Sequence, residues 1–263
     1  MQNCYFLLST LYAHNSDFEI DLYTDYDFGQ LLEKAPYKNI NIVFEEKDYS
    51  KINPLVWAWP KFVALDMVSR DTIHIDGDVF LKDNSCNLYF GNDDAICQHL
   101  EKDYHCKNYL NIWKKSYNSI EHLDWPAQIT KGIPSCMPNN GILGIKNESL
   151  WKTYRDSYWH MCNQCGPRSV RNVGYCVPDL IFEQYFLKQI CDKLGYKLGY
   201  FLDGDNSFEL HNDAVKKSYQ HVCSGKIADL QKCINLIKKK NIACYDMLKS
   251  NWGSLYPEYF EIL

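Results

Sequence analysis

Strand-like and helix-like segments alternate along this chain, and this alternation limits its fold more than any other feature. Residues 19–25 alternate apolar and polar side chains, as a half-buried strand does. Residues 54–69 have the apolar spacing of a helix, which Pro60 can kink. Strands are also expected at 39–44, 71–81, 141–145 and 196–202, and helices at 4–14, 28–35, 178–194, 226–240 and 243–250. The alternation predicts an α/β fold with a mostly parallel sheet flanked by helices.

The sequence contains no feature that marks a boundary between domains. It has no low-complexity linker, no internal repeat of solenoid period and no long block of like charges. We therefore expect a single domain, with a core over residues 1–225 and a helical extension over residues 226–263. The first strand is in question, because only about ten residues separate an apolar run at 4–8 from the strand at 19–25 and a parallel crossover needs a dozen or more. A paired strand before residue 10 would show that it is present.

Composition excludes several classes of protein. Hydrophobic residues make up 46% of the 263 residues, so the chain can bury a core and is not disordered throughout. The net charge of −5 excludes a generally basic surface, and we expect no nucleic-acid partner. No apolar run approaches the roughly 18 residues of a transmembrane helix, and the first residues lack the positive charge of a signal peptide. These observations favour a cytoplasmic protein without a transmembrane segment.

The cysteines favour reduced, buried thiols. Twelve in 263 residues fall short of the density of a small disulfide scaffold. Cys162 and Cys165, with His160 before them and Cys176 after, resemble one half of a zinc site. Zinc sites usually contain two such pairs, so we favour thiols that simply fill the core.

Aromatic residues make up 15% of the chain. Rings in a core fill space, whereas rings that line a cleft can stack on flat apolar faces such as those of sugars and bases. Composition does not distinguish the two. The tryptophans that could stack on a ligand are Trp57, Trp59, Trp125, Trp151 and Trp159.

The triplet Asp76-Gly77-Asp78 lies between two apolar runs, where a strand is expected to end. Two carboxylates one residue apart point to opposite faces of a continuous strand. A turn at Gly77 can bring both around one cation, because glycine adopts backbone angles that other residues avoid. Carboxylate oxygens are ligands of Mg²⁺ and Mn²⁺, which often bridge to phosphate. The alternative is a solvated acidic turn, which we favour for the second D-G-D at 203–205 because polar turn residues follow it.

The segment from Trp57 to Leu81 resembles the donor site of the GT-A glycosyltransferases, in which a D-x-D pair holds a divalent metal against a nucleotide-sugar diphosphate. Three further motifs follow in the family's order. P-N-N-G-I-L-G-I at 138–145 resembles the N-x-G strand beside the sugar, and F-E-Q-Y-F-L at 182–187 resembles the D-Q-x-x-L segment of retaining, glycogenin-like and galactosyltransferase-like members. Y-Q-H-V-C-S-G-K at 219–226 resembles the H-x-x-G-x-x-K motif. The resemblance covers roughly residues 19–226.

This resemblance implies a GT-A-like fold, a Mn²⁺ or Mg²⁺ cofactor, a nucleotide-sugar donor (a UDP-sugar above all) and an acceptor with a hydroxyl group, such as a carbohydrate. Asp76 and Asp78 would hold the metal and Asp76 would face the donor, with His221 as a third metal ligand. Lys61 and Lys226 would meet the diphosphate. His221 precedes Gly225 by one residue more than in the family's motif, so a hydrogen-bonded core histidine is the alternative. For Lys61 the alternative is a solvated helix face.

The remaining motifs would contact the sugar. Asn140 can exchange hydrogen bonds with sugar hydroxyls, and Gly141 lets the backbone approach closely, although both also suit a plain turn before a strand. Glu183, which replaces the family's aspartate, could act as a base toward an acceptor hydroxyl or stabilise an oxocarbenium ion. Gln184 could do only the second. Gln184 facing the anomeric carbon would favour retention of configuration, whereas Glu183 alone would favour inversion, and the sequence leaves both open.

Two other classes of function compete with a glycosyltransferase. The run I-H-I-D-G-D-V at 73–79 also fits the nucleophile strand of a phosphatase of the haloacid-dehalogenase type, in which the first aspartate attacks phosphate. That motif normally opens its domain, whereas here some seventy residues precede it. The third reading is a catalytically inactive protein of the same fold that binds a nucleotide or sugar, which a missing first strand would favour.

Overall fold

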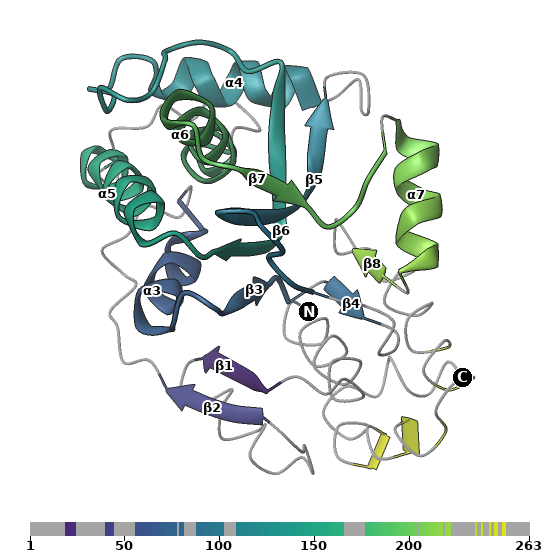
Figure 1. Cartoon of the computed structure of the whole chain (residues 1–263). Helices are drawn as coiled ribbons and strands as arrows, with labels where there is room; N and C mark the ends of the chain where they lie inside the picture. The colour runs from purple at the N-terminus through teal and green to yellow at the C-terminus, as the bar shows by residue number, and fades with distance from the viewer. Residues whose placement is uncertain are drawn as a thin grey trace. The chain divides into compact units, whose positions relative to one another are not determined.

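The computed structural model describes residues 19–24, 40–44, 56–77, 79–81, 88–102, 109–165, 177–204, 206–217 and 219–221, together with a few single positions from 235 to 250 (Figure 1). The chain divides into two compact units, each built from separate segments of the sequence. The first unit contains Met1–Lys47, Asp76–Asn87 and Val215–Leu263, and the second contains Asp48–Ile75 and Leu88–Ala214.

A four-stranded sheet forms the centre of the second unit. Its strands are β3 (Ile73–Ile75), β5 (Ala95–Lys102), β6 (Cys136–Ile145) and β7 (Leu198–Tyr200), in the order β3-β6-β5-β7. Strand β6 is antiparallel to both β3 and β5, while β5 is parallel to β7. The fold class is therefore α/β as predicted, but the sheet is mixed and the expected mostly parallel sheet is wrong. Alternation within a strand reports which face is buried and does not by itself fix the direction of the neighbouring strands.

Two pairs of short strands belong to the first unit. Strand β1 (Ile20–Thr24) pairs in parallel with β2 (Ile40–Phe44), which confirms the strands expected at 19–25 and 39–44. Strand β4 (Val79–Leu81) pairs antiparallel with β8 (Tyr219–His221). The single run expected at 71–81 thus forms two strands, β3 and β4, interrupted at the D-G-D triplet.

The described helices are α3 (Trp59–Met67), α4 (Tyr109–Ile120), α5 (Glu148–Gln164), the π-helix η2 (Leu180–Tyr185), α6 (Phe186–Leu194) and α7 (Ser207–Lys216). Helices η2 and α6 together confirm the helix expected at 178–194. Helix α3 is shorter than expected, because residues 56–58 are not helical. Pro60 lies in its first turn, where no backbone N–H is needed, so it helps to start the helix and does not kink it.

Aromatic rings fill the core of the second unit. Helices α5 and α6 lie side by side next to the sheet (Figure 1). Phe62 of α3 stacks on Tyr158 of α5 with ring centroids 3.5 Å apart, and it also contacts Trp151 and Tyr154. All four rings are almost completely buried. Much of the aromatic content is therefore core packing, each ring removing a large apolar area from water.

Several predictions lie outside the described residues. These are the helices at 4–14 and 28–35, the first strand, and the helical extension at 226–263 except for its few described positions. Among the helices that the structure describes, none is both long and apolar enough to span a membrane.

Candidate functional site

Three segments far apart in the sequence meet at the Lys61 ammonium group. Lys61 is on α3, and its Nζ donates hydrogen bonds to Glu183 Oε1 of η2 at 2.6 Å and to the Asn140 backbone oxygen of β6 at 3.1 Å. The side chains of Lys61 and Glu183 are 5% and 1% exposed, so this is a buried ion pair. The solvated helix face considered for Lys61 is therefore wrong. Three predicted residues, Lys61, Asn140 and Glu183, therefore meet in one buried polar cluster, and the buried Gln184 is the next residue along η2.

Glu183 is held through its backbone as well as through its carboxylate. Its carbonyl oxygen accepts hydrogen bonds from Asn140 Nδ2 at 3.2 Å and from the Tyr154 hydroxyl at 2.6 Å. Side-chain donors of this kind compete with the backbone hydrogen bonds of a helix, and Glu183 lies within the π-helix η2. Short π-helical segments occur frequently at functional sites.

Two amide oxygens of this cluster have no hydrogen-bond partner among the described residues. They are Asn140 Oδ1 and Gln184 Oε1, and their residues are 2% and 8% exposed. A buried acceptor without a donor costs about 1–3 kcal/mol, so most such groups bind a ligand or an ordered water. Gly141 is also buried, and its N–H donates to Asn139 Oδ1 at 3.0 Å. Both oxygens therefore keep an unused capacity to accept a hydrogen bond within the described part of the chain.

Asp179 connects the start of α3 to the start of η2. Its Oδ2 accepts from the Ala58 N–H at 2.7 Å and its Oδ1 accepts from the Tyr158 hydroxyl at 3.2 Å. Complete burial raises the pKa of its carboxyl to about 8, and the negative charge of Glu183 acts in the same direction, against the hydrogen bonds that favour ionisation. Neither Asp179 nor Tyr154 is among the site residues expected from the sequence. An acidic residue directly before the apolar helical run at 180–187 is the signal that points to Asp179.

The predicted metal ligands belong to the first unit. Asp76 is partly buried, and its carbonyl accepts from the Val79 N–H at 3.0 Å, so the chain turns at Gly77 as expected. Val79 pairs across β4 and β8 with His221. Asp78 lies outside the described residues, as do Gly225 and Lys226.

Carboxylate oxygens are ligands that suit Mn²⁺ and Mg²⁺, whereas imidazole nitrogens more often bind Zn²⁺, Cu²⁺, Fe²⁺ or Ni²⁺. Within the part of the chain that the structure describes, no three His, Cys, Asp or Glu residues gather into a metal-binding group. The fit of a metal to this site therefore depends on Asp78.

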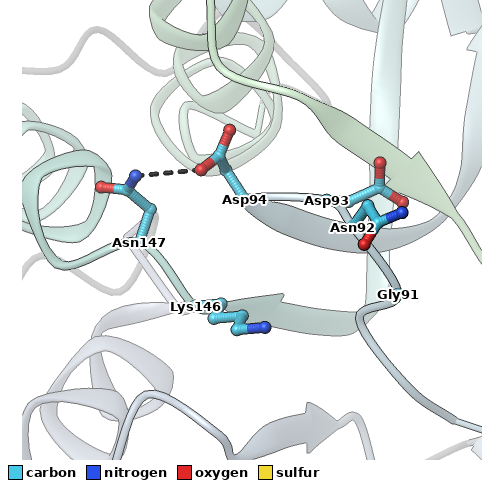
Figure 2. Close-up of a pocket in the computed structure, with 6 residues that line it drawn as sticks. All are labelled: Gly91, Asn92, Asp93, Asp94, Lys146 and Asn147. Carbon is cyan, nitrogen blue, oxygen red and sulfur yellow. Dashed lines mark hydrogen bonds between the residues drawn. The ribbon is translucent and has the colours of Figure 1, made fainter.

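A separate polar hollow of about 420 Å³ lies beside the start of α5 (Figure 2). Hydrogen bonds from the Lys197 N–H and the Asn147 side chain, both 2.9 Å long, lower the pKa of its carboxylate Asp94. These contacts join β5, α5 and the segment before β7, so Asp94 has a structural role. The hollow is lined by Gly91, Asn92, Asp93, Asp94, Lys146 and Asn147, and none of the predicted site residues is among them.

The remaining motifs have structural surroundings. Cys162 and Cys165 lie at the end of α5, where burial raises the pKa of both thiols, that of Cys165 to about 12. His160 Nε2 is 2.9 Å from the Asp124 carbonyl oxygen. The Asp203 N–H, in the second D-G-D, donates to Asp213 Oδ2 at 2.9 Å.

The tryptophans considered for stacking differ in exposure. Trp125 and Trp151 are core residues, whereas Trp57 is 52% exposed. Trp59 and Trp159 are partly buried and contact each other edge to face, with ring centroids 4.6 Å apart.

Together, the fold and the site define an α/β protein with a mixed sheet and a buried polar cluster of an ion pair and two amide oxygens. The chain belongs to the family DUF6734, a family of unknown function whose model matches residues 2–263. Neither a curated protein nor a solved structure matches the sequence.

Proposed function

We propose that this protein is a metal-dependent glycosyltransferase of GT-A-like fold that transfers a sugar from a nucleotide-sugar donor to an acceptor hydroxyl. The observation that carries the proposal is the buried polar cluster of Lys61, Asn140 and Glu183, because it brings together residues of the predicted donor site from three separate segments. The hydrogen bond from Asn140 to Glu183 joins two of the predicted motifs, which lie 43 residues apart in the sequence. A chance match of either motif alone would not require this contact.

The two amide oxygens suit a sugar because each accepts a hydrogen bond and each sugar hydroxyl donates one. Binding would supply the missing donors and remove the free-energy cost of two buried unpaired acceptors. Gly141 would let the backbone approach the ring closely, since it adds no side chain on the ligand's side.

The D-G-D triplet would hold the cation. Asp76 and Asp78 would be its carboxylate ligands, His221 would add an imidazole nitrogen, and Lys226 would bind the diphosphate. A bound Mn²⁺ or Mg²⁺ supplies positive charge that stabilises the nucleoside diphosphate as it leaves.

The contacts of Glu183 also favour one stereochemical course for the proposed reaction at the sugar. Glu183 is already paired with Lys61, whereas Gln184 has an amide oxygen available to stabilise positive charge at the anomeric carbon. This difference favours Gln184 over Glu183 as the group that faces the sugar, and with it retention of configuration. We place the protein in the cytoplasm, where the free thiols of its described cysteines would stay reduced.

The test is hydrolysis of UDP-glucose and UDP-galactose with Mn²⁺ present or absent, measured as released UDP. We expect Mn²⁺-dependent release by the natural protein and a loss of at least about a hundredfold in Asp76→Asn and Asp78→Asn, because each removes a metal ligand. Asp203→Asn and Asp205→Asn are the matched controls, since they change the other D-G-D triplet, and they should keep full activity.

Two results would contradict the proposal. One is release of UDP that is unchanged in Asp78→Asn. The other is fast hydrolysis of p-nitrophenyl phosphate that is lost in Asp76→Asn, with no cleavage of either nucleotide sugar, because that pattern identifies a phosphatase whose nucleophile is Asp76.

A further inference from the structure

We propose that Lys61 is a positioning residue that acts through Glu183 to hold Gln184 against the sugar, and that it does not bind the diphosphate. This inference rests on the proposed function and changes the role expected for Lys61 from its sequence. It follows from two acceptors that Lys61 Nζ contacts within the described residues, the Glu183 carboxylate and the Asn140 carbonyl oxygen.

The burial of the ion pair makes a change of partner costly. Lys61 and Glu183 are both inside the second unit, and removing one partner of a buried ion pair leaves the other charge unpaired in a medium of low polarity. If Lys61 turned toward a phosphate group, it would leave the buried Glu183 carboxylate without this partner. A lysine that binds phosphate ordinarily keeps its ammonium group accessible to the ligand.

Glu183 is fixed at both its side chain and its backbone. Lys61 holds the carboxylate, while Asn140 Nδ2 and the Tyr154 hydroxyl donate to the carbonyl oxygen. The next residue is Gln184, so the conformation of Glu183 sets the direction in which the Gln184 side chain leaves the backbone. A site that must hold a group within about half an ångström of its working position requires this kind of support.

Glu183 is consequently unsuited to remove a proton from the acceptor. Transfer of a proton to its carboxylate would leave the Lys61 ammonium group buried beside a neutral acid, and the ion pair stabilises the charged form of both groups. In this proposal Glu183 keeps its contact with Lys61 and supports Gln184.

A binding experiment that compares UDP with UDP-sugars tests this inference, because Lys61 should affect binding of the sugar and not of the nucleotide. Dissociation constants for UDP and for UDP-glucose and UDP-galactose are measured with Mn²⁺ for the natural protein and for Lys61→Met. We expect UDP affinity to change by less than about threefold, while the better UDP-sugar loses about tenfold or more relative to UDP. Lys61→Arg, which keeps the charge, should restore part of that preference. A tenfold loss for UDP itself would show that Lys61 contacts the diphosphate and would overturn the inference.

Lys188→Met is the matched control. Lys188 also forms an ion pair, with Asp192 four residues along α6, but this pair lies at the surface and contributes little. Lys188→Met should change neither UDP nor UDP-sugar affinity. A loss of sugar preference as large as that of Lys61→Met would overturn the inference, since it would show that loss of any lysine charge is sufficient.

Thermal unfolding measures the coupling between Lys61 and Glu183 without a nucleotide-sugar donor present. Lys61→Met alone should lower the Tm by about 10 °C, and the double variant with Glu183→Gln should lose clearly less than the sum of the two single changes. Additive losses would overturn the inference. If the natural protein binds no nucleotide, the proposed function fails, and the unfolding data still decide whether Lys61 acts through Glu183. If Lys61→Met does not fold, Glu183→Gln takes its place in the binding experiment and has the same expected result.

Discussion

Asp179 lies where three helices, α3, α5 and η2, meet. Its carboxyl accepts hydrogen bonds from the start of α3 and from Tyr158 of α5, and it directly precedes η2. It is fully buried, so the acid form is favoured in the folded protein, whereas the unfolded chain exposes an ordinary aspartate. Folding therefore binds a proton at Asp179 over a defined pH range.

The proton bound at Asp179 makes the free energy of unfolding depend on pH. The folded protein holds it up to about pH 8 and the unfolded chain releases it near pH 4, so this contribution to the free energy of unfolding is fully present below pH 4 and is lost as the pH rises to about 8. Asp179→Asn mimics the acid form. Urea unfolding at several pH values should show that its stability relative to the natural protein rises with pH, by at most about 1.4 kcal/mol per pH unit. A constant difference between the two proteins from pH 5 to pH 8 would contradict the prediction.

Among the elements, α5 shows how a helix start can also join strands. The Asn147 side chain accepts from the Ser149 and Leu150 N–H groups, which is an ordinary N-cap. Its Nδ2 also donates to Asp94, which in turn accepts from the Lys197 N–H before β7. The cap of α5 is thus connected to the two strands at one edge of the sheet.

Asn147→Ala is expected to destabilise the protein more than Asn206→Ala does. Both asparagines accept from two N–H groups at the start of a helix, and the loss of such a cap costs about 1 kcal/mol. Asn147→Ala also removes a donor to the Asp94 carboxylate, which adds about another 1 kcal/mol. Denaturant unfolding of the two variants measures the difference. Equal losses of stability would mean that the contact with Asp94 contributes nothing.

For the molecule as a whole, the two units draw their residues from alternating stretches of the sequence. The predicted ligands of the metal and the residues of the sugar cluster belong to different units. A ligand that binds the folded chain and not the unfolded chain must raise the stability of the fold, whichever groups it contacts.

We therefore expect UDP with Mn²⁺ to raise the Tm of the full chain. At a hundred times its dissociation constant a ligand adds about 2.7 kcal/mol, which corresponds to a rise of about 5–10 °C for a protein of this size. Asp78→Asn should abolish the rise, and Asp205→Asn should retain it. The measurement is a thermal shift series with UDP, with Mn²⁺ and with both. No rise for UDP or any nucleotide sugar, with or without Mn²⁺, would contradict the proposed function.

Local pattern was sufficient to predict part of the secondary structure. Strands β1 and β2 and the helix at 178–194 were predicted because their apolar periods are regular. Strand β5 was not, because its register on β6 shifts between Cys97 and His99, and such a bulge interrupts the period of two. Helices α4, α5 and α7 were also not predicted, although Asn147 and Glu148 form a recognisable start of α5.

For the candidate site too, the sequence was sufficient to predict some features and not others. The sequence was enough to select Lys61, Asn140, Glu183 and Gln184 through their resemblance to motifs of the GT-A glycosyltransferases, since motifs are local. It did not reveal that Lys61 pairs with Glu183 across 122 residues, or that Asp179 accepts a hydrogen bond from the Ala58 N–H directly before α3. Such contacts depend on how helices and strands pack, and residue types alone do not encode that packing.

By itself, the sequence determined that this chain folds with α/β composition, where several of its strands and helices lie, and which residues are candidates for the site. Only the tertiary structure decided that the sheet is mixed, that much of the aromatic content fills the core and that Lys61 is buried. The reason is physical. Periodicity and local propensity act between neighbours in the chain, whereas strand direction, burial and ion pairing arise between segments that meet only in the folded protein.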